Sequence, residues 1–318
     1  MNIVGLESLV YGVDDVEATI RFHQDWGLEL LEFEVSGADF VLADSTTVQI
    51  RRVDAAALLP ARIDWEHLGA STVREVVWGV DAPATRDAIS AELATDRDVR
   101  ADDDGTIHSA DDLGAAIAFR VSRRVPTALD LPDTNPVGSN PRLNRPAEGA
   151  ARRSARPRRF GHVVYWAPGD LTAAAAFYID RLGFRLTDRV GNGGIFLRCA
   201  GTTDHHNVLL QQQGGYLGFQ HVAYEFRDFD EVMLLGAHME AQGWRTNVGP
   251  LRHNIGSSLS WYIWNPAGGL AEAYCDMDSA DDDWQVRNFD PSDPSFYGHS
   301  WNARPEQAGR RPADLHDD

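Results

Sequence analysis

Apolar and polar positions alternate most clearly in three short segments of the second half of the chain. Each segment places one polar side chain among apolar neighbours. Because successive side chains point to opposite faces of a strand, this pattern predicts three strands that each turn one polar group toward a covered face. The segments are 160–165 around His162, 219–224 around His221 and 270–274 around Glu272.

A pattern of strand, turn and amphipathic helix occurs four times, twice in each half of the chain. Asp15 in the first half matches Asp170 in the second at an offset of 155 residues. Gly27 and Gly183 follow two of the expected helices, at the position of a helix C-cap. The predicted helices cover residues 16–26, 84–94, 171–182 and 229–242.

Each repeated unit combines one strand, one helix and further strands, so the predicted fold class is α+β. We expect two domains, each of two βαβββ modules and four modules in all, with curved mixed sheets that enclose a cavity. A Pro- and Arg-rich stretch separates the halves, and an acidic, aromatic stretch follows them. The predicted boundaries are an N-terminal domain at 1–122, a linker at 123–159, a C-terminal domain at 160–278 and a tail at 279–318.

Composition narrows the functional classes. The formal net charge is -19, and every basic residue is arginine. So acidic a chain repels nucleic acid and anionic membranes, and neither is a predicted partner. Without lysine the chain has no Schiff-base residue and no phosphate-binding loop lysine. Two cysteines and no run of 18 or more apolar residues predict a cytoplasmic protein without a membrane span.

The three polar groups of the second half form a candidate metal site. A buried imidazole or carboxylate needs a partner, and one cation satisfies three converging groups most simply. Two histidines and one carboxylate are the facial set of non-haem Fe(II) oxygenases. We therefore predict that His162, His221 and Glu272 bind Fe(II), with Mn(II) as the alternative metal, at the centre of the cavity of the C-terminal domain.

The repeat predicts no metal in the first half. The alignment gives His162, His221 and Glu272 the counterparts Glu7, Glu75 and Ile117. Two carboxylates without an imidazole bind Fe(II) poorly, and isoleucine cannot bind a metal. The first half is therefore interpreted as a scaffold.

Further residues follow the three ligands at characteristic positions. His205 and His206 precede His221, and His253 and Tyr262 stand nine residues apart, before Glu272. In this order the second half resembles the type I extradiol ring-cleaving dioxygenases of the vicinal oxygen chelate (glyoxalase–bleomycin resistance–dioxygenase) superfamily. The resemblance extends to the first half through the degenerate repeat. One departure is Gly256, where some members of the family have an aspartate three residues after the histidine at position 253.

The resemblance implies roles for these residues. His162, His221 and Glu272 match the iron ligands. His206 matches the acid–base histidine, and His205 is interpreted as its structural neighbour. His253 and Tyr262 match residues that hydrogen-bond substrate, oxygen or a ligand, and complete the predicted catalytic set of His206, His253 and Tyr262.

The resemblance also implies the reaction and its partners. The expected activity is cleavage of the ring of a substituted catechol with O2, in the catabolism of aromatic compounds. Family members commonly assemble, so a homo-oligomer is expected. We further expect an aromatic pocket wall, with Trp166, Phe196, Tyr216, Trp244 and Trp264 as its candidates.

Two other functions are compatible with this fold. A metal-dependent lyase or isomerase of the glyoxalase kind would usually take four ligands from two modules, whereas the sequence offers three, all in one half. A non-catalytic protein that binds small molecules would not need the metal ligands. Metal content and oxygen uptake separate these functions from ring cleavage.

Overall fold

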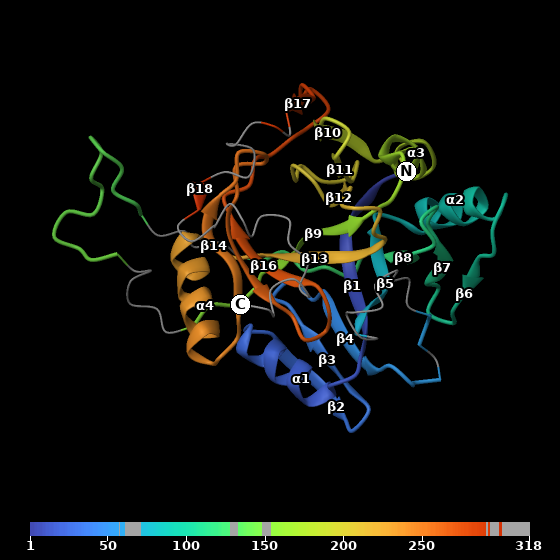
Figure 1. Cartoon of the computed structure of the whole chain (residues 1–318), viewed down its shortest axis with the longest axis horizontal. Helices are drawn as coiled ribbons and strands as arrows, with labels where there is room; N and C mark the ends of the chain where they lie inside the picture. The colour runs from blue at the N-terminus through green and yellow to red at the C-terminus, as the bar shows by residue number, and fades with distance from the viewer. Residues whose placement is uncertain are drawn as a thin grey trace.

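The computed structural model describes residues 1–56, 58–60, 71–127, 133–147, 154–290, 292 and 299–300. Within these residues each half of the chain builds one large sheet (Figure 1). The predicted tail beyond residue 300 and its aromatic residues at 296, 297 and 301 lie outside the described residues.

The first half consists of two modules, each with one strand, one helix and three strands. The first module is β1 (Ile3–Val13), α1 (Val16–Asp25), β2 (Glu29–Glu34), β3 (Gly37–Val41) and β4 (Thr47–Arg52). The second module is β5 (Thr72–Val80), α2 (Pro83–Leu93), β6 (Arg100–Ala101), β7 (Ile107–Ala110) and β8 (Ala116–Val121).

The second half repeats this order and adds two short strands. Its first module is β9 (Arg159–Trp166), α3 (Leu171–Ala176), the π-helix η2 (Phe177–Arg181), β10 (Arg185–Val190), β11 (Gly194–Arg198) and β12 (Val208–Gln211). The second is β13 (Gly218–Glu225), α4 (Phe229–Ala241), β14 (Thr246–Arg252), β15 (Leu259–Trp264) and β16 (Leu270–Cys275), followed by β17 (Arg287–Phe289) and β18 (His299–Ser300).

Both sheets are mixed, and their central strands come from different modules. The first has the order β2-β3-β4-β1-β5-β8-β7-β6, and the second β17-β10-β11-β12-β9-β13-β16-β15-β14-β18. In the first sheet β1 runs parallel to β4 and antiparallel to β5, and β9 has the same relation to β12 and β13. The predicted α+β fold of four βαβββ modules is therefore confirmed.

The helices form where the sequence predicts them, within a residue or two at each end. Asp15 and Asp170 cap α1 and α3 by accepting a backbone N–H in the first turn. Gly27 and Gly183 follow the first and third helices with φ of 90° and 77°, a conformation that favours glycine. The third predicted helix differs in kind, because its second part is the π-helix η2.

Aromatic side chains join the two halves. Trp26 of α1 lies 5.6 Å from Tyr224 of β13, measured between ring centroids. Tyr11 of β1 meets Phe219 of β13 edge to face at 6.2 Å. Residues of both halves thus belong to one continuous apolar core.

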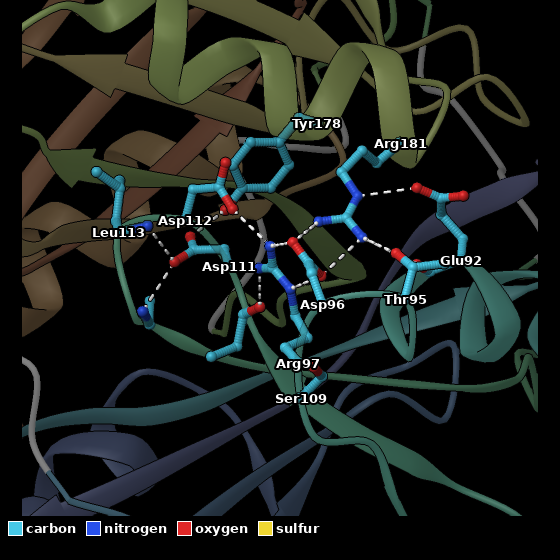
Figure 2. A network of polar contacts seen from close by, with 12 residues as sticks. Glu92, Thr95, Asp96, Arg97, Ser109, Asp111, Asp112, Leu113, Tyr178 and Arg181 are labelled. Atoms are coloured by element: carbon cyan, nitrogen blue, oxygen red, sulfur yellow. Dashed lines mark hydrogen bonds and ion pairs between the residues drawn. The ribbon is translucent and has the colours of Figure 1, made fainter.

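A polar network also crosses between the halves. Arg181 of η2 donates to Glu92 and Asp96, each at 2.9 Å (Figure 2). Close by, the hydroxyl of Tyr178 donates to Asp111 of the first half at 2.7 Å. Both Tyr178 and Asp111 are buried, so this hydrogen bond is shielded from water.

The stretch between the two sheets contacts both halves of the chain. The tail after β16 contacts the second half. Arg159, at the start of β9, forms an ion pair with Asp204 at 2.6 Å. Arg156 reaches Glu29 of the first half at 2.7 Å. In the tail, β17 pairs in parallel with β10. The division into domain, linker, domain and tail stays a proposal.

Candidate metal centre

Three polar side chains converge on one face of the second sheet. Nε2 of His162 lies 3.1 Å from Nε2 of His221. Oε2 of Glu272 lies 3.0 Å from the first of these nitrogens and 3.1 Å from the second. All three residues are buried, with 3%, 6% and 1% of their surface exposed. The structure thus brings together the three residues that the sequence predicts as metal ligands.

Strand order explains this convergence. The three residues lie on β9, β13 and β16, which are consecutive neighbours in the sheet. His221 pairs with the residue two positions after His162. Glu272 pairs with the residue two positions after His221. Because side chains repeat on one face every second residue, all three side chains point to the same face.

The donor set fits a divalent metal ion. Two ligand atoms bound at right angles, each about 2.1 Å from one ion, lie about 3.0 Å apart. The separations between His162, His221 and Glu272 match this spacing. The buried carboxylate of Glu272 faces the imidazoles of His162 and His221 and the hydroxyl of Tyr262. A buried carboxylate needs a cation to balance its charge.

The protonation states also suit metal binding. Burial lowers the pKa of His221 to about 4, so its imidazole is neutral near pH 7. Gln220 accepts a hydrogen bond from Nδ1–H of His221, which leaves Nε2 with the lone pair. Burial alone raises the pKa of Glu272, but the neighbouring His162 and His221 outweigh it and hold this pKa well below its ordinary value. The site therefore offers the neutral imidazole of His221 and the ionised carboxylate of Glu272.

His253 and Tyr262 lie beside the three candidate ligands. Nε2 of His253 and the hydroxyl of Tyr262 share a hydrogen bond of 2.8 Å. Nε2 of His253 is 3.9 Å from Oε1 of Glu272. The ring of Tyr262 meets that of His221 edge to face, with centroids 5.3 Å apart. The two residues therefore form a polar pair at the edge of the cluster.

His206 contacts the cluster from the other side. Its ring centroid lies 4.1 Å from that of His162. Burial lowers the pKa of His206 well below its ordinary value, so its imidazole is neutral near pH 7. Phe196 packs edge to face on the same ring at 5.0 Å. A neutral, buried imidazole beside a metal site is suited to accept a proton.

Asp188 and Arg287 lie in this region, and the sequence predicted a role for neither of them. His205 contacts His206 on one side and Asp188 of β10 on the other. Asp188 is fully buried and also pairs with Arg287 of β17 at 2.6 Å. An aspartate within the polar–apolar alternation of 185–190 was the available signal for Asp188. Nothing local in the sequence connects it to Arg287.

Gly256, the departure from the family pattern, packs against His205. Its φ is 73°, and a Cβ at this position would lie 3.2 Å from Nδ1 of His205. A side chain here would therefore be strained and crowded. The backbone oxygen of Gly256 also accepts a hydrogen bond from the backbone of Asp278. Glycine thus permits the close approach of His205 at this point.

Contacts distinguish two of the candidates for the aromatic wall, Phe196 and Trp244. Phe196 lies against His206, as a wall residue would. Trp244, by contrast, packs on α1 of the first half, with Phe22 at 5.1 Å and its Nε1 donating to Asp25 at 2.8 Å. This candidate for the pocket wall therefore lies at the contact between the halves.

Strand register changes one counterpart in the first half. His162 stands two residues before the strand partner of His221. Ser8 stands two residues before the strand partner of Glu75. The counterpart of His221 is therefore Glu75, as predicted, but that of His162 is Ser8 and not Glu7. Glu7 lies at a register shift in β1, which displaces the alignment by one residue.

A second counterpart changes for the same reason. Ala118 pairs with the residue two positions after Glu75. Glu272 has this relation to His221 in the second half. The counterpart of Glu272 is therefore Ala118 and not Ile117, which belongs to the apolar core. A one-residue shift exchanges the two faces of a strand.

Part of the second half matches a known family model. Residues 159–268 match the model of the Glyoxalase/Bleomycin resistance protein/Dioxygenase superfamily. The superfamily resemblance predicted from the sequence is confirmed. The matched residues include His162 and His221 and end just before Glu272.

Two curated relatives match about half of this chain. Metapyrocatechase 2 of Cupriavidus necator is 29% identical over 175 residues, which are 52% of this chain and 54% of that protein. Biphenyl-2,3-diol 1,2-dioxygenase of Paraburkholderia xenovorans is 29% identical over 161 residues, which are 48% of this chain and 52% of that protein. The chain thus spans about half the length of the curated relatives it matches.

Solved structures share the fold over nearly the whole chain. A Mn(II)-bound glyoxalase from Novosphingobium aromaticivorans has a TM-score of 0.74 at 22% identity, covering 96% of this chain and 94% of the other. A 2,2',3-trihydroxybiphenyl 1,2-dioxygenase from Sphingomonas wittichii has a TM-score of 0.68 at 20% identity, covering 93% and 99%. At these identities the likeness concerns the fold alone. None of the described helices has the length and apolar character needed to cross a membrane.

Proposed function

We propose that this protein is a non-haem Fe(II)-dependent extradiol dioxygenase. It opens the ring of a substituted catechol with O2, and both oxygen atoms enter the product. The main observation behind the proposal is the buried cluster of His162, His221 and Glu272, with atoms 3.0–3.1 Å apart. The partial similarity to metapyrocatechase 2 and to biphenyl-2,3-diol 1,2-dioxygenase supports this reaction class.

The metal would be held by Nε2 of His162, Nε2 of His221 and Oε2 of Glu272. We propose Fe(II), with Mn(II) as the alternative, because this ligand set accepts both. Bound there, the metal would supply a positive charge that favours the deprotonated catechol and a redox centre for O2. With only three protein ligands, a metal held here would remain open to substrate.

His206 is proposed as the residue that moves a proton. Its burial keeps the imidazole neutral near pH 7, so a ring nitrogen accepts the proton of a catechol hydroxyl. Its contact with His162 places it beside the metal ligands. The same nitrogen later returns the proton to the product oxygen, so His206 ends the cycle neutral.

Tyr262 and His253 are proposed to hold the substrate from the opposite side. Burial raises the pKa of Tyr262 well above its ordinary value, so the phenol keeps its proton. Its hydrogen bond with His253 fixes the hydroxyl in one orientation. A fixed phenol and imidazole orient a substrate oxygen and exclude water from the cluster.

The remaining partners follow from the reaction. A catechol and O2 are the proposed substrates, and a homo-oligomer in the cytoplasm is the proposed working form. An acidic chain with net charge -19 is not expected to bind nucleic acid or anionic membranes.

The test is anaerobic reconstitution with Fe(II), followed by a panel of catechols in air. The panel contains catechol, the 3- and 4-methyl derivatives and biphenyl-2,3-diol. A yellow ring-opened product that forms with uptake of one O2 per catechol supports the proposal. A protein that binds one metal per chain but consumes no O2 with any of them contradicts it, and a glyoxalase-type assay then becomes the next test. A protein that retains no metal favours the non-catalytic binding function.

A further inference from the structure

A buried chain of hydrogen bonds runs from Asp188 through His205 to His206. Oδ2 of Asp188 lies 3.0 Å from Nε2 of His205. Nδ1 of His205 lies 3.0 Å from Nδ1 of His206. The exposed fractions of the three residues are 0%, 0% and 5%, so water does not compete for these contacts.

We propose that Asp188 and His205 are positioning residues that fix the tautomer of His206. The chain places the proton of His206 on Nδ1 and leaves Nε2 as the nitrogen with the lone pair. The catalytic consequence rests on the proposed ring cleavage, whereas the tautomer itself does not.

The position of each proton follows from the donors and acceptors. An ionised carboxylate only accepts hydrogen bonds, so Nε2 of His205 carries a proton toward Asp188. Arg287 already balances the charge of Asp188, through Nη2 at 2.6 Å and its backbone N–H at 2.9 Å. Arg287 also reaches Asp278 at 3.8 Å, but His205 is fully buried and a second cation at this position would be costly, so we assign its ring a single proton. Its Nδ1 then holds a lone pair.

In the contact between Nδ1 of His205 and Nδ1 of His206, one nitrogen must carry a proton and the other must accept it. Since Nδ1 of His205 holds a lone pair, Nδ1–H of His206 is the donor. A neutral imidazole has a single ring proton, so Nε2 of His206 is unprotonated. The hydrogen bond donated by Nδ1–H of His206 thus leaves the lone pair on Nε2 of the same ring. Hydrogen-bond partners of metal-bound imidazoles fix the tautomer in the same way.

The surrounding packing keeps His205 in this position. Its ring lies edge to face with Phe196 at 5.8 Å and with Trp284 at 5.4 Å. Gly256 allows the ring to approach the backbone on a third side. Nε1 of Trp284 donates to the backbone oxygen of Thr187 at 3.1 Å, which ties the segment after β16 to β10. The early part of the tail therefore completes the surroundings of His205 and Asp188.

Proton-detected nitrogen NMR of the full chain labelled with [15N]histidine tests the tautomer directly. The spectra are recorded on the metal-free protein and with Zn(II), a diamagnetic probe, and His206→Phe identifies the signals of His206. We expect a protonated Nδ1 and an unprotonated Nε2 at His206. A wild-type spectrum with the proton of His206 on Nε2 overturns the proposal without any variant.

Two variants remove the chain of hydrogen bonds. His205→Phe keeps a ring between Phe196 and Trp284 but deletes the acceptor for Nδ1 of His206. Asp188→Asn removes the charge that holds the proton on Nε2 of His205. Each should convert the single tautomer of His206 into a mixture. Each should also lower kcat about 10–100-fold, with KM within about twofold and unchanged metal content.

His108→Phe is the matched control, because it removes a histidine with carboxylate partners in the first half, outside this chain of hydrogen bonds. It should leave both the tautomer and kcat unchanged. A single Nδ1–H tautomer in both His205→Phe and Asp188→Asn contradicts the proposal. If wild-type protein shows the expected tautomer but cleaves no catechol, the proposed function fails while the inference about His206 stands.

Discussion

The two halves share one architecture but differ at three positions on one face of the sheet. In the second half these positions hold His162, His221 and Glu272, whose polar atoms converge within 3.1 Å. In the first half strand register places Ser8, Glu75 and Ala118 there. These three differences replace the candidate metal ligands of the second half with a set that has a single carboxylate.

The first half satisfies its remaining carboxylate internally. Nδ1 of His108 lies 2.8 Å from Glu75, and Nε2 of the same ring lies 2.9 Å from Asp102. These residues line a cavity of about 550 Å³ on that half. Glu75 therefore pairs with His108 of its own half, whereas Glu272 faces the imidazoles of His162 and His221. The comparison shows that the scaffold supplies the positions, while three side chains decide whether a cation is needed there.

The largest expected effect comes from removing a ligand in the second half. His162→Ala, His221→Ala or Glu272→Ala should reduce bound metal from about one per chain to roughly a tenth or less, because two remaining donors hold the ion poorly. Metal analysis after desalting measures this. Glu75→Ala and Ser8→Ala are the matched controls in the first half and should retain full metal. An equal loss of bound metal from the variants of the two halves would contradict the difference between the halves.

A smaller but still large effect is expected at His206. His206→Phe should keep the metal and lower kcat by about 10²–10⁴, the usual contribution of a residue that transfers protons. Steady-state kinetics together with metal analysis measure the two quantities. His108→Phe is the control, because His108 is the histidine nearest Glu75 in the first half. An undiminished kcat in His206→Phe would remove His206 from the mechanism.

The contact between the halves should depend on pH through Asp111. Burial raises the pKa of Asp111 from 3.8 to about 6, so the folded state binds its proton more tightly than the unfolded state. This contribution to stability is complete below about pH 4 and is lost as the pH rises through 6. The hydrogen bond from Tyr178 remains, but the charge is then buried.

Asp111→Asn, which cannot ionise, should escape this loss. Between pH 4 and 7 the free energy of unfolding of the wild type should fall by up to about 3 kcal/mol relative to the variant. Denaturant titrations of both proteins at several pH values measure the difference. A constant difference across this range would show that Asp111 has an ordinary pKa.

The smallest effect is expected at Glu7. Its carboxylate accepts hydrogen bonds from Ser122 at 2.6 Å and the backbone of Arg123 at 3.2 Å, and it pairs with Arg124 at 3.1 Å. Glu7→Gln keeps an acceptor but loses the charge, so it should cost about 1–2 kcal/mol of stability. Activity and metal content should not change. A loss of metal in this variant would restore Glu7 as a counterpart of His162.

The sequence predicted the strands, the helices and the convergence of His162, His221 and Glu272, because these rest on local patterns. Period-2 alternation located the strands of His162, His221 and Glu272, and strand order alone then brings the three together. The four helices lie close to their predicted limits, and α1, α3 and α4 each begin at an Asp cap, which is a local signal.

Long-range packing was not predictable in the same way. A bulge at Glu7 shifted the repeat by one residue, and no local signal revealed it. Asp188 meets Arg287 across nearly a hundred residues of sequence, and Trp244 packs on the other half of the chain. Such contacts depend on how sheets and modules pack, which a periodic pattern does not encode.

The most direct test of the account is the rate of oxygen uptake with a catechol, measured against Fe(II) added per chain under otherwise anaerobic handling. In wild type and in Glu75→Ala, the rate of oxygen uptake should rise until one equivalent of Fe(II) per chain has been added. In Glu272→Ala there should be no oxygen uptake at any Fe(II) level. Uptake that needs two equivalents, or that persists in Glu272→Ala, would contradict the assignment of one catalytic metal to the second half.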